Sequence, residues 1–296
     1  MSTEPVKLDV LGSDVAERGP TALRIAIGGQ LRKLREECDI TREAAGEHIR
    51  GSHAKISRLE LGRHAFKERD ITDLLTLYGV SDPDQRERLL DLVRKANHPG
   101  WWHTYGDLFP PWFETYLGLE GAASSIRTFE NQLVPGLLQT EDYARAVLAL
   151  GPDTTEAARQ VELRRRRQEI LTAPNGPKLW AVLEESVLHR PIGGTQVLRA
   201  QIEHLLAMST MPNVTLQVLP YTAGISAAAG CCSFTLLRFA EQELPDIVYV
   251  ELLTNALYLE RRQDLERYRQ VMERIVIEAE QPERARHRLR TLAAQL

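Results

Sequence analysis

Residues 52–63 hold several side chains that can form hydrogen bonds with nucleic acid. Lys55 suits the O6 and N7 acceptors of guanine, His53 suits a single acceptor, and Ala54 suits the methyl group of thymine. Arginine and hydroxyl side chains nearby suit backbone phosphates. These residue types predict contacts to double-stranded DNA, and the candidate residues are Arg42, Ser52, His53, Ala54, Lys55, Ser57, Arg58 and Arg63.

Two short helices joined by a tight turn are predicted to position these side chains. Thr41 and Ser52 each precede a helical pattern, where a hydroxyl caps the helix by accepting from a backbone N–H. Arg50-Gly51 interrupts the pattern, and we expect the glycine to supply backbone freedom there. Gly46 falls where the two helices must cross closely. This arrangement is typical of a helix-turn-helix, whose second helix enters the major groove.

The same stretch resembles the repressor-like (XRE, Cro/cI) family. The matching residues are Ile40, Thr41, Glu43, Glu47, Ile49, Ser52, Ile56-Ser57-Arg58-Leu59-Glu60 and Gly62. The sequence departs from the family pattern at Arg42, where glutamine is frequent, and at Arg50-Gly51, where the turn glycine is shifted by one residue. The alternative is a helix pair inside an all-helical core, which would not need exposed Arg and Lys.

The resemblance also implies an ion pair. Residues 21–38 are predicted to form a first helix that contains Arg35. In the repressor-like family an Arg at this position pairs with the Glu that matches Glu60, which would fix the second helix of the motif to the bundle. The alternative is two unrelated surface charges.

The charge distribution agrees with a DNA-binding module. The net charge is −4, but residues 20–69 hold eleven Lys or Arg against seven Asp or Glu, a local balance of +4, so the rest sums to −8. A basic module on an acidic body is the pattern expected when one face meets phosphates.

Four segments are predicted along the chain. Residues 1–20 are polar and aperiodic and are predicted to form a flexible arm. The helix-turn-helix domain covers 21–80, and 81–111 is a helical and aromatic linker that leads away from it. Its prolines and aromatics favour a hinge docked on the second domain, with a ligand or partner groove as the alternative. Residues 112–296 form a regulatory and partner-binding domain.

That second domain is predicted to be α+β. Residues 114–173 have helical periodicity, with an apolar stripe from Tyr116 to Phe129. Strands are predicted at 178–184, 214–219, 234–239 and 247–251, with 256–259 as a candidate fifth. Helices are expected at 195–209, 260–280 and 282–294. The predicted fold is an N-terminal all-α repressor-like helix-turn-helix domain followed by a larger α+β domain with a mainly antiparallel sheet covered by helices.

A second resemblance covers roughly 112–285. Its residues are Glu120, Ala122-Ala123, Ile126, Phe129-Glu130 and the run Val134-Pro-Gly-Leu-Leu-Gln-Thr-Glu-Asp-Tyr-Ala. They resemble the domain that follows the helix-turn-helix in WhiJ-like actinobacterial regulators. The resemblance implies transcriptional control of development or secondary metabolism, and a small acidic partner protein in an antitoxin-like pairing. No catalytic residue carries over.

Aromatic and arginine side chains are candidates for binding that partner. Arg164-Arg165-Arg166-Arg167 would point around most of a helix, so a solvated face paired with Glu162 and Glu169 is the simplest interpretation. Phosphate contacts or an acidic partner are the alternatives. Because Arg and Trp are common interface anchors, the candidate partner-binding residues are Trp101, Trp102, Trp112, Arg164 and Arg165.

Several function classes are not expected. The sequence has no apolar run long enough to span a membrane and no signal core, so we expect a cytoplasmic protein, associated with the nucleoid when bound to DNA. Three cysteines make neither a disulfide framework nor a zinc site, and a redox switch at Cys231-Cys232 is a minor alternative. His189, His204, Glu184 and Glu185 match no catalytic or metal template, so neither an enzyme nor a cofactor is predicted.

The patterns together predict a sequence-specific transcriptional regulator, acting as a homodimer on an inverted repeat. One alternative is an antitoxin-like protein that sequesters a small partner and regulates its own gene. The other is a repressor that senses a small-molecule effector through a pocket in the α+β domain.

Overall fold

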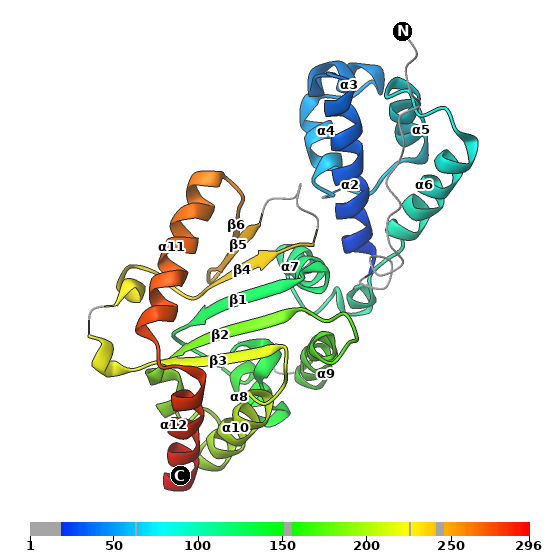
Figure 1. The fold of residues 1–296 in the computed structure, drawn as a ribbon. Helices are drawn as coiled ribbons and strands as arrows, with labels where there is room; N and C mark the ends of the chain where they lie inside the picture. Colours follow the sequence, from blue (N-terminus) through cyan, green and yellow to red (C-terminus); the bar gives the residue numbers. More distant parts are fainter. Residues whose placement is uncertain (1–18, 63, 151–155, 225, 241–245) are drawn as a thin grey trace. The chain divides into compact units, whose positions relative to one another are not determined.

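The computed structural model describes residues 19–62, 64–150, 156–224, 226–240 and 246–296 (Figure 1). The chain divides into two compact units, the first ending at His103 and the second beginning at Thr104. The predicted arm lies outside the described residues, apart from Gly19 and Pro20. No helix in the described ranges is both long enough and apolar enough to cross a membrane.

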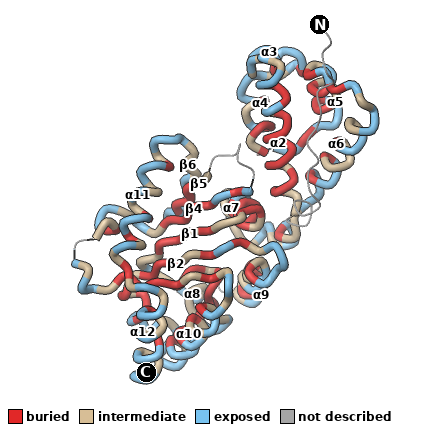
Figure 2. Tube along the Cα trace, viewed as in Figure 1, coloured by how far each residue is buried: buried red, intermediate tan, exposed pale blue. Residues whose placement is uncertain are grey.

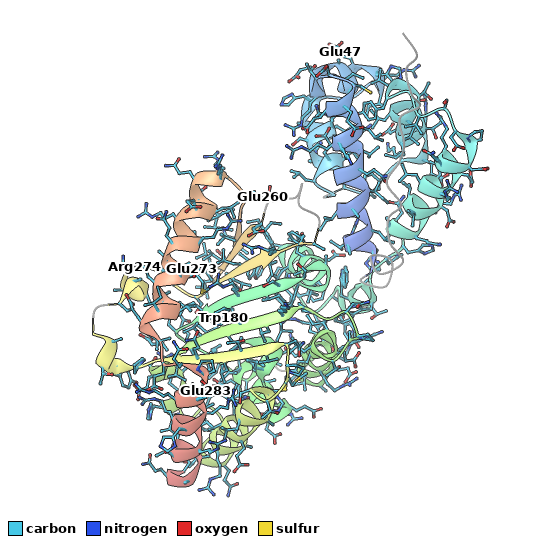
Figure 3. The ribbon with its side chains drawn as sticks, viewed as in Figure 1. Glu47, Trp180, Glu260, Glu273, Arg274 and Glu283 are labelled. Atoms are coloured by element: carbon cyan, nitrogen blue, oxygen red, sulfur yellow. The ribbon has the colours of Figure 1, made fainter. Side chains whose placement is uncertain are left out.

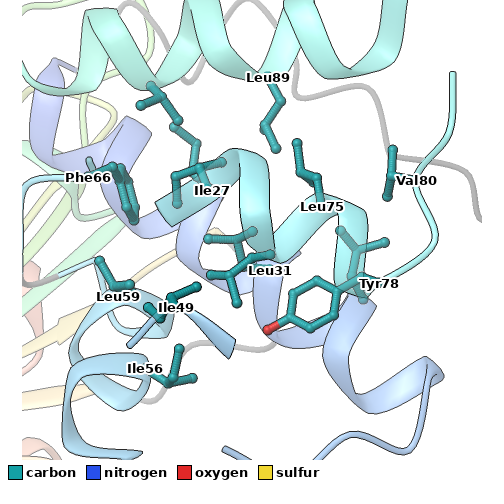
Figure 4. Packing of buried hydrophobic residues seen from close by; sticks show 14 of the residues in the cluster. Ile27, Leu31, Ile49, Ile56, Leu59, Phe66, Leu75, Tyr78, Val80 and Leu89 are labelled. Atoms are coloured by element: carbon teal, nitrogen blue, oxygen red, sulfur yellow. The ribbon is translucent and has the colours of Figure 1, made fainter. Parts of the chain in front are cut away.

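The first unit is a bundle of helices around one hydrophobic core. Its helices are α2 (Pro20–Glu37), α3 (Arg42–His48), α4 (His53–Glu60), α5 (Glu68–Leu77) and α6 (Pro83–Ala96). A short 3-10 helix, η1 (Trp101–Tyr105), follows them. Each α-helix contributes to the core, through Leu31, Ala45, Ile56, Leu75 and Val93 respectively (Figure 4).

Helix α6 belongs to this core, which corrects the prediction that it leads away from a domain ending near residue 80. Leu89, Val93 and Ala96 are buried in the cluster and form one apolar stripe at helical spacing. Asn97 closes the packing, because its side chain accepts from the Phe66 N–H at 2.9 Å and donates to the Phe66 carbonyl at 2.7 Å. The many charges of α6 lie around this stripe and concealed it in the sequence.

The second unit is an α+β domain. Its helices are α7 (Pro111–Ala122), α8 (Glu141–Leu148), α9 (Ala157–Gln168), α10 (Thr195–Met208), α11 (Arg262–Glu278) and α12 (Pro282–Gln295). Short 3-10 segments are η2 (Gly136–Leu138), η3 (Glu169–Leu171), η4 (Glu185–His189), η5 (Tyr221–Ala223) and η6 (Ala227–Gly230). The strands are β1 (Ser125–Glu130), β2 (Lys178–Glu184), β3 (Val214–Leu219), β4 (Phe234–Arg238), β5 (Ile247–Glu251) and β6 (Ala256–Leu259).

The strands form one mixed sheet with the order β3-β2-β1-β4-β5-β6. The pairs β1–β2 and β2–β3 are parallel, whereas β1–β4, β4–β5 and β5–β6 are antiparallel. The predicted α+β domain with a mainly antiparallel sheet is therefore confirmed.

Strand β1 corrects the prediction that the apolar stripe from Tyr116 to Phe129 is helical throughout. Helix α7 ends at Ala122, and the chain then enters the middle of the sheet between β2 and β4. Because helices and loops cover both faces of this strand, its burial does not alternate, and Ile126 and Phe129 stand three residues apart, as in a helix.

Helix α11 covers one face of the sheet (Figures 1 and 2). Phe129, Phe234 and Val248 pack there with Met272 and Ile275 of the helix. On this face, Arg127 of β1 lies 5.0 Å from the ring centroid of Trp180 and 2.6 Å from a carboxylate oxygen of Glu273 (Trp180 and Glu273 are labelled in Figure 3).

Candidate nucleic-acid interface

Both predicted helix caps are present in the helix-turn-helix. The Thr41 hydroxyl accepts from the Ala44 N–H at 3.2 Å, and the Ser52 hydroxyl accepts from the Lys55 N–H at 3.3 Å. Gly46 lies at the crossing of α3 and α4, because a Cβ on it would stand 2.9 Å from the Ser52 carbonyl carbon. The first turn of α4 is therefore held in place by its own cap and by α3.

The turn between the helices differs from the prediction. Arg50 has a φ of 53° and takes the left-handed conformation that was expected of Gly51. Its N–H donates to the Glu47 carbonyl at 3.0 Å, and the Gly51 N–H donates to the Gly46 carbonyl at 2.8 Å. These two bonds form a Schellman motif, in which glycine usually holds the position of Arg50.

Two glycines allow α4 to lie close against α2. Gly62 ends α4 with a φ of 65°, and a Cβ on it would lie 2.6 Å from the Ile25 nitrogen. Gly28, inside α2, would place a Cβ 2.5 Å from the Leu59 carbonyl oxygen. Sequence reasoning missed Gly28, although a glycine within a helix is an unusual choice that signals close packing.

The ion pair implied by the family resemblance is present. Arg35 donates from Nε to Glu60 Oε1 at 2.5 Å and from Nη2 to Glu60 Oε2 at 3.2 Å. Both residues are buried, and Arg35 Nη1 also donates to the Ile40 carbonyl at 2.8 Å. The hydrogen bond from Arg35 to Glu60 raises the pKa of the guanidinium. The pair joins α4 to α2.

Arg42 is a second partner of the same carboxylate. Its Nε donates to Glu60 Oε2 at 2.9 Å, while 39% of its side chain stays exposed. The predicted phosphate contact therefore has to come from the remaining guanidinium nitrogens, oriented by Glu60. This link between the start of α3 and the end of α4 was not anticipated.

Lys55 is also held by a carboxylate. Its Nζ lies 2.5 Å from Oδ2 of Asp70, in the first turn of α5. The predicted base-reading amine is thus paired within the protein. No sequence signal marked Asp70, because the contact depends on the packing of α5.

The outer surface of α3 and α4 displays several predicted DNA-binding residues. Ser52, His53, Ala54 and Arg58 are exposed, whereas Ser57 is half-buried. Ala44, which was expected on the buried face of its helix, is exposed, as are Thr41, Glu43, Glu47, His48 and Arg50 (Glu47 is labelled in Figure 3). Arg63 lies outside the described residues.

The five residues predicted to bind a partner do not share one environment. Trp102 is buried with the edge-on ring of Trp101 5.8 Å away, and Trp112 lines a cavity of the second unit. Arg165 is exposed and pairs with Glu162 at 2.8 Å and Glu169 at 3.1 Å, as in the solvated-face interpretation. Arg164 lines the same cavity as Trp112.

The three cysteines of the described residues, Cys38, Cys231 and Cys232, are free thiols. Burial raises the pKa of Cys231 to about 11, so its thiol stays protonated near neutral pH. No cluster of three potential metal ligands is present in the described part of the chain.

Comparisons with known proteins agree with this division. Residues 26–89 match a family described as a helix-turn-helix domain, and residues 113–291 match a family described as a domain of unknown function, DUF5753. No curated protein and no solved structure matches the chain. The chain therefore belongs to the DUF5753 family, with a helix-turn-helix domain preceding the domain that defines it.

Proposed function

We propose that this protein is a sequence-specific transcriptional regulator that reads DNA with helix α4. The observation that carries the proposal is the first turn of α4, where Ser52, His53 and Ala54 are exposed while Glu60 ties the other end of the helix to α2. The N-terminal part of a recognition helix meets base edges, and a fixed helix presents them in a defined register.

Lys55 reads a guanine in this proposal, after exchanging Asp70 for the base. Lys55→Ala is expected to weaken binding to the preferred site by about 1–3 kcal/mol and to relax the preference at one base pair. Asp70→Asn is the matched test, because it leaves Lys55 in place without its carboxylate partner and should strengthen binding. A preferred sequence that is unchanged in Lys55→Ala would contradict this role.

Arg42 binds a backbone phosphate in the same proposal. Arg42→Ala should weaken binding to all DNA sequences by the same factor. It should also reduce the slope of log affinity against log salt concentration by about one unit. The experiment is a titration of the purified protein against a DNA site library at several salt concentrations. A changed base preference in Arg42→Ala would reverse the assigned roles of the two residues.

The proposal extends to assembly and biology through the resemblance to WhiJ-like regulators. The protein acts as a homodimer on an inverted repeat, with a small acidic partner, in the control of development or secondary metabolism. A pull-down from the native host should recover that partner, and recovery of DNA alone would contradict it. In the antitoxin-like alternative, sequestration of the partner is the main task and DNA binding is autoregulation.

One structural feature favours small-molecule sensing as a second function. The second unit contains a cavity of about 710 Å³, within the range of about 300–1,000 Å³ that is usual for small-molecule sites. A ligand that alters DNA affinity would make the protein a ligand-responsive regulator.

A further inference from the structure

The cavity of the second unit lies on the side of the sheet opposite α11. Strands β1, β4 and β5 line it together with α7 and α9, so it is formed wholly within that unit. Leu252 and Leu253, in the turn after β5, line it and are exposed, so the cavity reaches the surface beside them.

Aromatic rings form one wall of the cavity. Tyr116 stacks on Tyr249 with ring centroids 4.1 Å apart, and on Phe113 at 5.7 Å. Trp112 lies next to Phe113, edge-on at 5.9 Å. Such a wall favours an aromatic or otherwise apolar ligand body.

Arg167 and Glu120 neutralise each other at the base of this wall. Arg167 donates from Nε and Nη2 to the two carboxylate oxygens of Glu120, both at 2.9 Å. The guanidinium also lies 5.2 Å from the ring centroid of Phe113 and 5.6 Å from that of Tyr116. Because both members are buried and satisfied, this pair is part of the framework and has no charge left for a ligand.

Arg164 lines the same cavity but lacks a counter-ion. Its Nη1 donates to Gln139 Oε1 at 2.9 Å and to the Ala144 carbonyl at 3.4 Å, and both acceptors are neutral. Among the described residues, no carboxylate forms an ion pair with it. Burial and the nearby Arg167 lower the pKa of Arg164 to about 10, while the charge of Glu251, which also lines the cavity, opposes the shift. Arg164 is still charged at neutral pH. An enclosed charge without a partner is costly, and an anionic ligand would relieve that cost.

The carboxyl groups of the cavity already have hydroxyl donors. Glu130 accepts from the Thr128 hydroxyl at 3.3 Å, and Glu251 accepts from the Tyr249 hydroxyl at 2.9 Å. Glu251 is exposed, whereas burial raises the pKa of Glu130 to about 7, so Glu130 is largely neutral in slightly acidic solution. Among the described residues neither carboxyl group lies within ion-pairing distance of Arg164, so its guanidinium has no direct counter-ion and can accept one from a ligand.

We propose that this cavity binds an organic anion, whose acidic group pairs with Arg164 and whose aromatic or apolar body lies against Tyr116, Tyr249 and Trp112. The inference concerns ligand binding alone, so it does not depend on whether the protein binds DNA.

Two fluorescent probes test the proposal on the full chain. 1-Anilinonaphthalene-8-sulfonate carries the ring system and an acidic group, and N-phenyl-1-naphthylamine has the same rings without the charge. Fluorescence titration should show one site that binds the sulfonate at least tenfold more tightly than the neutral amine. Equal affinity for both probes, or tighter binding of the cationic 1-naphthylmethylammonium, would overturn the proposal.

Variants locate the site. Arg164→Gln should weaken sulfonate binding at least tenfold and change binding of the neutral amine less than twofold. Arg165→Gln is the matched control, because Arg165 is the exposed neighbour on the same helix and should change neither. Unchanged sulfonate binding in folded Arg164→Gln would contradict the assignment. The comparison of probes on the wild-type chain needs no variant, so it decides the question even if Arg164→Gln does not fold.

Discussion

Glu60 connects three elements of the DNA-binding unit. It accepts from Arg35 of α2 and from Arg42 of α3, while it belongs to α4 itself. Family resemblance predicted the first contact, because it recurs at fixed positions of a motif. The second depends on an arginine that replaces the frequent glutamine, and a motif comparison had no means to place it.

Glu60→Gln should therefore destabilise the first unit by up to about 3–5 kcal/mol, because the buried Arg35 charge would keep only Glu36, half exposed and 3.3 Å away, as a counter-charge. Arg42→Gln is the control and should cost about 1 kcal/mol or less, since Arg42 is partly exposed. Urea unfolding of the full-length protein measures both. An equal decrease in the free energy of unfolding for the two variants would show that the buried Arg35–Glu60 pair stabilises the protein no more than the partly exposed Arg42–Glu60 pair.

Glu130 makes stability depend on pH. Burial raises its pKa from 4.5 to about 7, with a smaller contribution from the Glu251 charge, while the hydroxyls of Ser233 and Thr128 oppose the shift. Between these values the folded chain holds a proton that the unfolded chain has released. The folded state is therefore stabilised at low pH, and this contribution is lost as the pH rises through about 7.

Glu130→Gln should remove that dependence. At pH 8 the variant should be more stable than the wild type by roughly 2–3 kcal/mol, and at pH 4 the two should be nearly equal. Urea unfolding at both pH values gives the difference, in which groups common to the two proteins cancel. A difference that is the same at pH 4 and pH 8 would contradict a raised pKa.

At the scale of elements, the turn between α3 and α4 contains backbone strain at Arg50 that a glycine would relieve. Arg50 adopts the left-handed conformation, which costs a non-glycine residue roughly 1 kcal/mol. Arg50→Gly should stabilise the protein by several tenths to about 1 kcal/mol, after the greater freedom of glycine in the unfolded chain is subtracted.

Gly51→Ala is the matched control for this turn. Gly51 is not among the residues with positive φ. An added Cβ would lie 2.7 Å from Cδ of the Lys55 side chain, which can shift, and in ordinary contact with Ile49 Cγ1 at 3.6 Å. Its effect on the melting temperature should be small. If Gly51→Ala destabilises the protein more than Arg50→Gly stabilises it, the assignment of the strained position is reversed.

The elements that sequence patterns identified best are those with an unambiguous period. Strands β2, β3, β5 and β6 have the predicted bounds, because β-rich runs between turn signals mark them. Strand β1 escaped detection because it is buried on both faces, and α6 was assigned to a linker because its apolar stripe is narrow among charges. Both errors concern tertiary burial, which local periodicity does not report.

For a similar reason, the side chains that line the cavity could not be predicted from the sequence. The arginines at 164–167 were predicted to point around most of a helix, with a solvated face paired with Glu162 and Glu169. Arg165 is exposed as that prediction has it, but the sequence did not indicate that Arg164 lines a cavity or that Arg167 is buried against Glu120. Successive positions on a helix point about 100° apart, so their separate environments are set by what packs on each side. The caps at Thr41 and Ser52, which need only local backbone, were predicted correctly.

At the scale of the whole molecule, two-fold assembly needs a surface, and the sheet of the second unit offers one at β6. This strand is at an edge of the sheet, whereas the other edge strand, β3, contacts α12. Leu257 of β6 is 42% exposed and Leu253, in the preceding turn, is fully exposed. An edge strand with exposed leucines pairs readily with a second copy of itself, and such pairing is two-fold symmetric.

Sedimentation velocity of the full chain at tens of micromolar should therefore show a dimer, and Leu257→Glu should shift it to a monomer. Ile277→Glu is the control. Ile277 is an exposed residue of α11 and is similar in size to Leu257, and its substitution should leave the dimer intact. The monomeric variant should lose affinity for an inverted repeat but keep its affinity for a single half-site, because α4 is unaltered. A wild-type chain that sediments as a monomer would refute the dimer, and a dimer that persists in Leu257→Glu would place its interface elsewhere.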